Sequence, residues 1–166
     1  MEIFVTRFNN ITIQENKNWL IKNNEIGCIY GSPVKITDKI LPESHIIVIE
    51  MNNSKNIIEG MGIIKNKLLP NEKKYRIYKE NNYNRFIYKS NIRIDRISFN
   101  NYEKSIIKDL EKLLFKTRNH CKRGQGIQLL PKHINDDKEF NYKRFLYNMY
   151  YNRFISIDKS KILIKS

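Results

Sequence analysis

Two apolar runs separated by a polar turn constrain the fold of this chain more than any other feature. Residues 45–51 read HIIVIEM and residues 57–64 read IIEGMGII, so both runs are rich in β-branched side chains. Residues 52–54 between them read NNS, a combination typical of turns. The pattern predicts a β-hairpin. Gly60 and Gly62 in the second run indicate a bulge, a bend or the close approach of another group.

Shorter strand signals flank this hairpin. Each is a run of β-branched or aromatic residues near Asn, Gly or Pro. They predict strands at residues 2–7, 27–30, 75–78, 85–88 and 92–94, with a last edge strand at 162–164. Pro33 and Pro42 argue against a long element between them, so we expect residues 34–42 to form a connector.

The clearest helix signal lies at residues 101–116. Apolar side chains recur there at steps of three and four, at Tyr102, Ile106, Leu110, Leu113 and Leu114. Asn100 or Asn101 is placed to cap the N-terminus of this helix. Weaker patterns predict helices at residues 12–21, which include Trp19, and at the aromatic residues 140–151.

These elements together predict an α+β fold. We expect a small, curved, mixed or antiparallel β-barrel of about five to six short strands with about two to three flanking helices. At 166 residues the chain is expected to form a single domain, residues 1–166, with a core large enough to be stable without disulfides or a structural metal.

The charge balance favours a polyanionic partner. Lys plus Arg number 31 against 17 for Asp plus Glu, which gives a net charge of +14. An excess this large suits nucleic acid first and an anionic membrane surface second. Codon bias is a competing explanation, because the chain has no alanine and is rich in Ile, Asn and Lys. Such bias exchanges Arg for Lys, but it does not by itself produce the deficit of acidic residues.

The cysteines and the apolar runs bear on metal binding and on location. Cys28 and Cys121 lie far apart and form no C-x-x-C pair, and no Cys/His spacing typical of zinc is present. We therefore expect no metal and no cofactor. The N-terminus lacks a signal-peptide pattern and the apolar runs are strand-sized, so no membrane partner is expected. These features favour an intracellular protein with both thiols free.

A basic segment with two glycines, NHCKRGQGI at residues 119–127, is the first candidate binding site. Its cations suit phosphates, and amides near the glycines are suited to an anion-binding nest. The candidate residues are His120, Lys122, Arg123, Gly124, Gln125 and Gly126. The glycine spacing is not that of a nucleotide-triphosphate loop. The alternative is a solvated surface turn.

A second candidate is the segment 82–96, NYNRFIYKSNIRIDR, which interleaves aromatic and basic residues. Aromatic faces stack on unpaired bases while cations hold phosphates. The basic candidates are Arg85, Lys89, Arg93 and Arg96. Trp19 and Tyr30 are further candidates, for a base-sized pocket. In the alternative interpretation the aromatic side chains form the core and the cations lie on the solvent-exposed face of the strands.

The sequence carries no known catalytic motif. Glu50 and Glu59 lie across from one another in the predicted hairpin, so they are candidates to hold Mg²⁺ in a nuclease-like hydrolase. A cross-strand pair on a solvated face is the commoner explanation. His120 is a candidate general base, but nothing in the spacing pairs it with a nucleophile. The sequence therefore favours a binding protein over an enzyme.

The order of elements in residues 2–66 resembles the PUA-like superfamily, which includes the YTH, EVE and ASCH domains. The resemblance is carried by EIFVTR, the helix after it, GCIYGS and the hairpin HIIVIEMNNSKNIIEGMGIIKN. It implies a small curved barrel that binds RNA or modified DNA, with the modified base in an aromatic cage. Tyr30 falls near the position of the first cage tryptophan, and Trp19 lies just before it. The chain departs from the family pattern because its only tryptophan is Trp19.

The alanine-free composition also resembles that of proteins from large AT-rich cytoplasmic DNA viruses, although parasites and symbionts with AT-rich genomes share it. A viral protein of this kind would work in the cytoplasm of the host cell.

We therefore expect a non-enzymatic nucleic-acid-binding protein that prefers RNA to DNA and uses a basic surface and an aromatic pocket. The resemblance implies a modified base as one possible ligand. Two alternatives stay open at this point: a nucleic-acid-processing hydrolase, and a basic structural or assembly protein of a virion.

Overall fold

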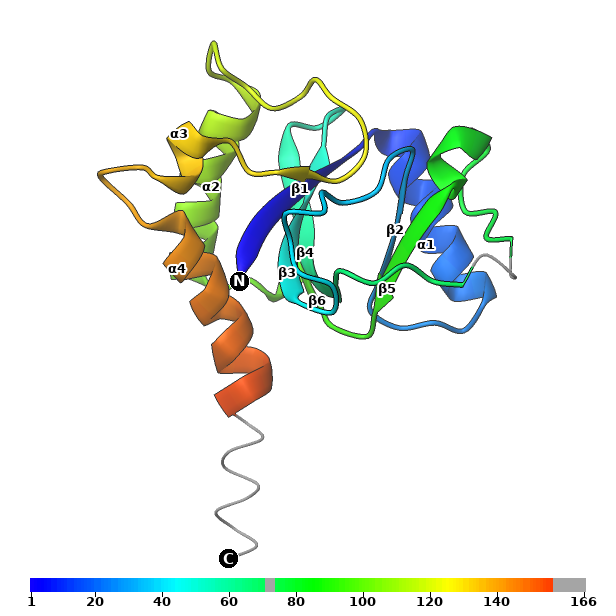
Figure 1. Cartoon of the computed structure of the whole chain (residues 1–166). Helices are drawn as coiled ribbons and strands as arrows, with labels where there is room; N and C mark the ends of the chain where they lie inside the picture. Colours follow the sequence, from blue (N-terminus) through cyan, green and yellow to red (C-terminus); the bar gives the residue numbers. More distant parts are fainter. Residues whose placement is uncertain (71–73, 157–166) are drawn as a thin grey trace, which may run out of the picture. The chain divides into compact units, whose positions relative to one another are not determined.

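The computed structural model describes residues 1–70 and 74–156 (Figure 1). The chain divides into two compact units, Met1–Leu130 and Pro131–Ser166, and each is described by itself. The single domain expected from the chain length stays a prediction.

The predicted hairpin forms the centre of a five-stranded sheet in the first unit. Strand β3 (His45–Asn52) pairs antiparallel with β4 (Ile57–Lys65). On its other side, β3 pairs parallel with β1 (Glu2–Phe8), so the sheet is mixed. Two short edge strands, β6 (Arg93–Asp95) and β7 (Gln128–Leu129), complete the order β6-β4-β3-β1-β7.

A bulge interrupts the hairpin beside one of its two glycines. Glu50 pairs with Gly60, but the register then shifts, so that Glu59 is an extra residue in β4. A Cβ on Gly60 would lie 2.5 Å from the carbonyl oxygen of Ile94 in β6. Glycine therefore lets the edge strand approach, which is one of the roles expected at this position.

A second, two-stranded sheet lies beside the first. It pairs β2 (Cys28–Ser32) antiparallel with β5 (Phe86–Ser90), and Tyr30 stands opposite Tyr88. These strands and helices confirm the predicted α+β class.

The two sheets are linked through the main chain. The amide of Ile63 in β4 donates to the carbonyl of Ile92, just after β5, over 3.0 Å. Two single-turn 3-10 helices, η1 (Asn81–Asn84) and η2 (Arg96–Ser98), flank this region. Within the described residues the strands form two sheets and no closed barrel, so the barrel is not confirmed.

Capping boxes define the starts of both long helices in the first unit. Helix α1 (Asn10–Lys22) is capped by Asn9, which accepts from the amide of Thr12 over 2.8 Å. The side chain of Thr12 accepts from the Asn9 amide in return, over 2.9 Å. Helix α2 (Asn101–Phe115) is capped in the same reciprocal way by Asn100. Such pairs satisfy amides that have no partner within the helix.

The five-stranded sheet is covered on both faces. Figure 1 shows α2 on one side of it, with α1, β2 and β5 on the other. The core on the α1 side includes Phe4, Phe8, Ile13, Ile29 and Val48. Burial on both faces explains why the strand sequences read as nearly continuous apolar runs.

The second unit is described as far as residue 156. It contains α3 (Lys132–Asn135), α4 (Tyr142–Tyr150) and one π-helical turn, η3 (Tyr151–Ile155). The side chain of Asn141 caps α4. The helix predicted from the aromatic pattern is thus confirmed, although it begins at Tyr142.

Residues 75–78 do not form the predicted strand. The amides of Ile77 and Tyr78 both donate to Asn84 Oδ1 over 3.0 Å, and Asn84 Nδ2 donates to the Tyr78 carbonyl over 2.7 Å. A side-chain amide therefore takes the place of a neighbouring strand. In contrast, β7 forms where the sequence predicted none. The strand expected at 162–164 lies outside the described residues.

Cys28 and Cys121 are both buried and free, in agreement with the prediction. None of the helices in the described part of the chain combines the length and the apolar character needed to cross a membrane.

Candidate functional site

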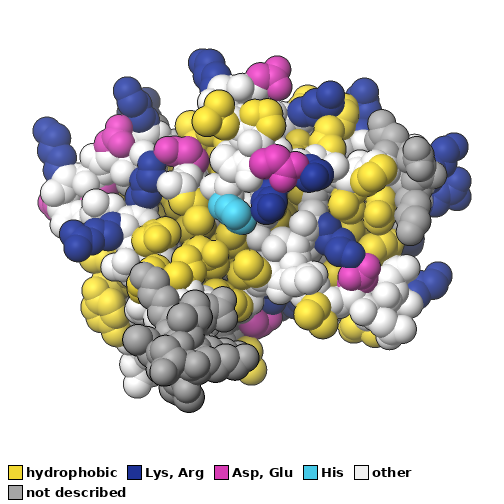
Figure 2. Space-filling view, turned by 60° about the horizontal axis from the view of Figure 1, so that its bottom comes forward, with side chains coloured by type: hydrophobic (Ala, Val, Ile, Leu, Met, Phe, Trp, Pro, Cys, Tyr) yellow, Lys and Arg dark blue, Asp and Glu magenta, His cyan; other side chains and the backbone are white. Residues whose placement is uncertain are grey.

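Charge alone does not locate a binding surface on this protein. On the face shown in Figure 2, Lys and Arg side chains are dispersed among acidic and apolar side chains. The hollows of the first unit are more informative, because ligands usually bind in concave sites. Two of these hollows share a wall residue, Tyr78.

The smaller hollow, here called the Arg7 pocket, has a volume of about 220 Å³. It lies where the end of β1 meets the start of α1, and β2 and the 119–127 segment also contribute to its walls. Segments that are far apart in the sequence line it, among them residues 6–9, Gly31, Asn53, Tyr83 and Lys122.

Arg7 lines this pocket and binds the 119–127 segment. Its Nε donates to the carbonyl of Cys121 over 2.5 Å. Its Nη1 is buried and has no hydrogen-bond partner among the described residues. Burial lowers the pKa of Arg7, although the charges of Cys121 and Tyr83 act in the opposite direction. A buried donor left unpaired costs about 1–3 kcal/mol.

Asn53 lines the same pocket and also keeps one polar atom unpaired. Its Nδ2 donates to the carbonyl of Lys122 over 2.9 Å, which fixes the orientation of the amide. Its Oδ1 is then buried without a partner in the described part of the chain. Two residues of the pocket lining, Arg7 and Asn53, thus each keep one buried polar atom without a partner among the described residues.

Two glycines hold the 119–127 segment against the strands. Gly124 has φ +119° and Gly126 has φ +69°, conformations that other residues rarely adopt. A Cβ on Gly126 would lie 2.1 Å from Ser32 Oγ, and one on Gly124 would lie 3.2 Å from Arg7 Cζ. The sequence pattern predicted a close approach to an anion, but the structure explains both glycines by their approach to protein groups.

A third glycine brings an aromatic ring to the pocket. A Cβ on Gly31 would lie 2.0 Å from the carbonyl oxygen of Tyr83 and 2.9 Å from Tyr78 Cε2. The chain at η1 can therefore pack directly on β2. The rings of Tyr78 and Tyr83 meet edge to face, with centroids 6.5 Å apart.

The larger hollow, here called the Trp19 cleft, has a volume of about 790 Å³. Trp19 lines it and packs against Tyr75 with ring centroids 5.8 Å apart. Four cations belong to the same lining: Lys22, Lys74, Arg76 and Lys79. All four are exposed to solvent. A cleft lined by an aromatic ring and by exposed cations is typical of proteins that bind single-stranded nucleic acids.

Arg85 belongs to an adjoining hollow of about 270 Å³, which shares Lys74 and Arg76 with the Trp19 cleft. The Arg85 guanidinium lies 5.4 Å from the centroid of the Phe86 ring. It is exposed and keeps its place among the candidate phosphate contacts.

Tyr30 is not available to stack on a base. It is 1% exposed, and its hydroxyl donates to Glu50 Oε1 over 2.7 Å. Burial raises its pKa well above the ordinary value. A Cβ on Gly62 would lie 2.2 Å from the Tyr30 hydroxyl, so the glycine gives this buried ring its space. The predicted pocket between Trp19 and Tyr30 is therefore wrong, because only Trp19 faces a hollow.

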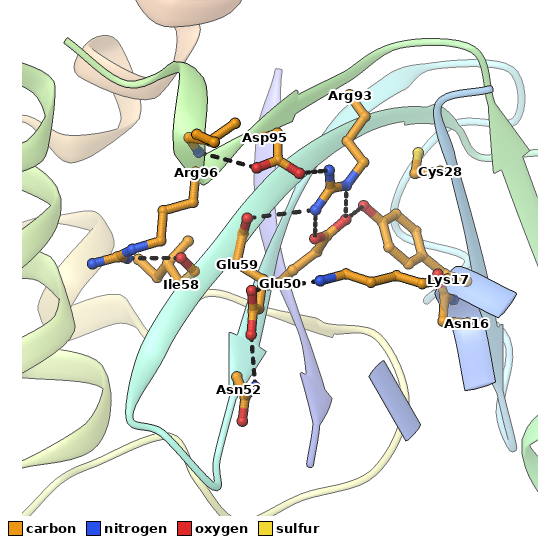
Figure 3. Close-up of polar contacts among 12 residues, drawn as sticks. Asn16, Lys17, Cys28, Glu50, Asn52, Ile58, Glu59, Arg93, Asp95 and Arg96 are labelled. Carbon is orange, nitrogen blue, oxygen red and sulfur yellow. Dashed lines mark hydrogen bonds and ion pairs between the residues drawn. The ribbon is translucent and has the colours of Figure 1, made fainter. Parts of the chain in front are cut away.

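Three of the predicted phosphate-binding cations are held in internal ion pairs, and Figure 3 shows those of Arg93. Arg93 bonds to Glu50 and Asp95, and Lys89 bonds to Glu25 over 2.5 Å. Burial acts to lower the pKa of Arg93, but hydrogen bonds to the two carboxylates outweigh it and the pKa is raised.

Arg96 is the third of these cations. It donates to the carbonyl of Ile58 over 2.8 Å and pairs with Glu111 of α2. These three cations tie strands and helices together, and their charge is already compensated. They are therefore poor candidates for binding phosphate.

Glu50 and Glu59 do enter one polar network, as Figure 3 shows. Glu50 is 3% exposed, and its oxygens are bonded by Tyr30 and Arg93, so the expected solvated face is wrong for it. Glu59 accepts from Asn52 over 2.7 Å. The described residues contain no group of three His, Cys, Asp or Glu side chains able to hold a metal ion. The carboxylates of this network are occupied by structural contacts.

The remaining residues of the 119–127 segment differ in whether they line the Arg7 pocket or are exposed to solvent. Lys122 lines the Arg7 pocket, and its amide donates to His120 Nδ1 over 3.3 Å. Arg123 and Gln125 are exposed. The segment therefore brings one cation, Lys122, to the pocket lining, while His120 orders the turn.

Arg7 and Asn53 were not among the residues indicated by the sequence. Arg7 follows an apolar strand, and Asn53 sits in a turn where asparagine is common. Their unpaired atoms arise from tertiary packing, for which the local sequence carries no signal.

Comparison of the chain with known protein families, with curated proteins and with solved structures finds no match.

Proposed function

We propose that this protein binds single-stranded nucleic acid, with one unpaired base in the Arg7 pocket and the adjoining backbone along the Trp19 cleft. The observation that carries the proposal is that one residue, Tyr78, lines both a small pocket and an open, basic cleft. A polynucleotide needs both kinds of surface, whereas a free metabolite needs only the first.

The chemistry of the cleft supports the backbone assignment. Lys22, Lys74, Arg76 and Lys79 line it, and none of them is engaged in an ion pair within the described chain. Free cations release counterions from phosphates when they bind, which is the main source of affinity for polynucleotides. The net charge of +14 acts in the same direction through long-range attraction.

The pocket supports a partner with unpaired bases, which RNA offers more often than DNA does. It is sized for one small group and is enclosed by residues from several segments. Sequence-specific RNA recognition targets loops, bulges and ends, where bases are already unpaired. Duplex DNA would have to expel a base first, at a cost of a few kcal/mol.

We further propose that the fold is PUA-like and that the protein acts inside the cell, in the host cytoplasm if it is viral. The order β1, α1, β2 and the β3–β4 hairpin supports the first point. A modified base stays one possible occupant of the pocket under this proposal.

Fluorescence anisotropy with labelled single-stranded RNA and DNA of equal length tests the proposal. We expect binding at low salt, tighter for RNA, with an affinity that falls linearly on a logarithmic scale as salt rises. A double-stranded DNA of the same length should bind more weakly. Absence of binding to every single strand at low salt would overturn the proposed function.

A further inference from the structure

The hollow that adjoins the Trp19 cleft, here called the Arg85 hollow, shares much of its lining with the cleft. Its volume is about 270 Å³. Four residues line both hollows: Lys74, Arg76, Asn81 and Asn84. Arg85 lines only the second hollow. Because each shared residue borders both hollows, the two lie next to one another on the first unit.

Asn84 fixes the chain at the boundary between the two hollows. Its Oδ1 accepts from the amides of Ile77 and Tyr78 over 3.0 Å, and its Nδ2 donates to the Tyr78 carbonyl over 2.7 Å. Arg76 directly precedes the bonded residues, and Arg85 directly follows Asn84. One asparagine therefore holds together the two segments that carry these cations.

The positive charge of the Arg85 hollow is not compensated. Lys74, Arg76 and Arg85 are exposed, and none of them forms an ion pair within the described chain. No Asp or Glu among the described residues lines this hollow. A further cation is near, because Lys35 Nζ lies 5.6 Å from the centroid of the Phe86 ring, to which Arg85 is also close. Exposed, unpaired cations are the groups that exchange their hydration and counterions for phosphates.

Aromatic side chains connect the two hollows as well. Tyr75 lines the Arg85 hollow, and its ring contacts that of Trp19, which lines the cleft. Leu69 and Ile87 add apolar side chains to the lining of the second hollow. Surfaces that follow a single strand combine cations for the phosphates with aromatic side chains for the bases. A small anion would use only the cations.

Resting on the proposed single-strand binding, we propose that the strand continues from the Trp19 cleft past Arg76 into the Arg85 hollow. The partner is then an extended single strand and not an isolated nucleotide. Arg76, which lines both hollows, contacts the phosphate between them. Arg85 contacts a phosphate farther along the strand, which a short oligonucleotide held in the cleft does not reach.

The test compares two strand lengths by fluorescence anisotropy with the full chain. Labelled oligouridines of about four and about twelve nucleotides both fall within the site sizes of single-strand-binding folds. For the longer strand, Arg85→Ala should make the slope of log affinity against log salt shallower by about 0.7, the contribution of one phosphate contact. The slope for the shorter strand should change less. A longer strand offers more binding registers, but that factor is the same for every variant and does not alter the slope.

Arg144→Ala is the matched control. It removes the same side chain from an exposed position of α4, outside the lining of both hollows. The salt slope of this variant should stay nearly unchanged for both lengths. Both arginines are exposed, so the midpoint of thermal unfolding should be close to that of the wild type in each variant.

The outcomes separate the two proposals. If Arg85→Ala leaves the salt slope of the longer strand unchanged, the continuous path is wrong while single-strand binding stands. An equal loss of slope for both lengths, or an equal loss in Arg144→Ala, would also overturn the path. Failure of every oligonucleotide to bind at low salt would remove the proposed function and this inference together.

Discussion

Arg93 holds Glu50 with two hydrogen bonds, 2.8 Å from Nε to Oε1 and 2.7 Å from Nη2 to Oε2. Glu50 lies in the central strand β3 and is 3% exposed, whereas Arg93 lies in the edge strand β6. The hydroxyl of Tyr30 donates to the same carboxylate from the second sheet. One buried charge therefore joins the hairpin, the edge strand and β2.

Removing Arg93 should be strongly destabilising, because it leaves a buried carboxylate without its cation. We expect Arg93→Ala to lower the free energy of unfolding by about 3–5 kcal/mol, as measured by urea denaturation. The double variant Arg93→Met with Glu50→Gln removes both charges and should lose less. If Arg93→Ala unfolds at the wild-type urea concentration, the pair has no such role.

The buried thiol of Cys28 predicts a loss of stability in alkali. Burial raises the pKa of Cys28 to about 12, and the Glu50 charge adds to that effect. The folded protein thus holds the thiol proton more tightly than the unfolded chain. The contribution of this thiol to the free energy of unfolding is fully present below the ordinary thiol pKa of 9.0. It declines as the pH rises from there towards about 12.

Urea denaturation at neutral and alkaline pH measures this decline. Between the two pKa values the unfolded chain has lost the proton and the folded protein has kept it. In that range the free energy of unfolding falls by about 1.4 kcal/mol per pH unit for each such group. Burial also raises the pKa of Tyr30 and Tyr88, so their effect has the same sign. Cys28→Ala should therefore show a shallower, but not absent, decline. An identical decline in wild type and Cys28→Ala would rule out the thiol as a contributor.

The glycines of the 119–127 segment predict a contrast between neighbouring positions. Gly126→Ala must place a methyl group at a φ of +69° and 2.1 Å from Ser32 Oγ. We expect it to lower the free energy of unfolding by about 1–3 kcal/mol. Gln125→Ala alters an exposed side chain and should change stability by less than about 0.5 kcal/mol. Thermal unfolding of both variants checks the contrast, and equal effects would contradict it.

The sequence predicted those parts of the fold that depend on neighbouring residues. The β3–β4 hairpin follows from two β-branched runs and a turn, and α2 follows from its apolar spacing and the Asn100 cap. Residues 75–78 have a strand-like pattern, but the side chain of Asn84 takes the hydrogen bonds that a strand would need. That competition depends on a residue in a different turn, so local periodicity could not reveal it.

The candidate site was harder to predict, because its function depends on which charges are already paired. Arg93 and Arg96 read as a basic stripe beside aromatic residues, yet each is neutralised by an acid from a distant segment. Arg7 carries no comparable signal, although its Nη1 is the buried donor that lacks a partner in the described chain. Pairing of this kind is set by the tertiary structure, and one sequence does not encode it in a readable pattern.

The same distinction between free and paired cations yields a prediction for binding. Lys22 and Lys79 line the Trp19 cleft and are exposed, so they are expected to contact phosphates. Replacing both by alanine should weaken binding to single strands of any sequence. It should also make the slope of log affinity against log salt shallower by about 1.4, because each of the two lost phosphate contacts contributes about 0.7 on a single strand.

A second double variant supplies the control for this prediction. Lys104→Ala with Lys108→Ala removes the same charge from exposed positions of α2, outside the Trp19 cleft. It should lower affinity slightly through long-range attraction while leaving the salt slope nearly unchanged. If both double variants reduce the slope equally, the protein binds through diffuse charge and the cleft has no special part. If only the cleft variant does so, the phosphates lie beside Trp19, next to the pocket that holds Arg7.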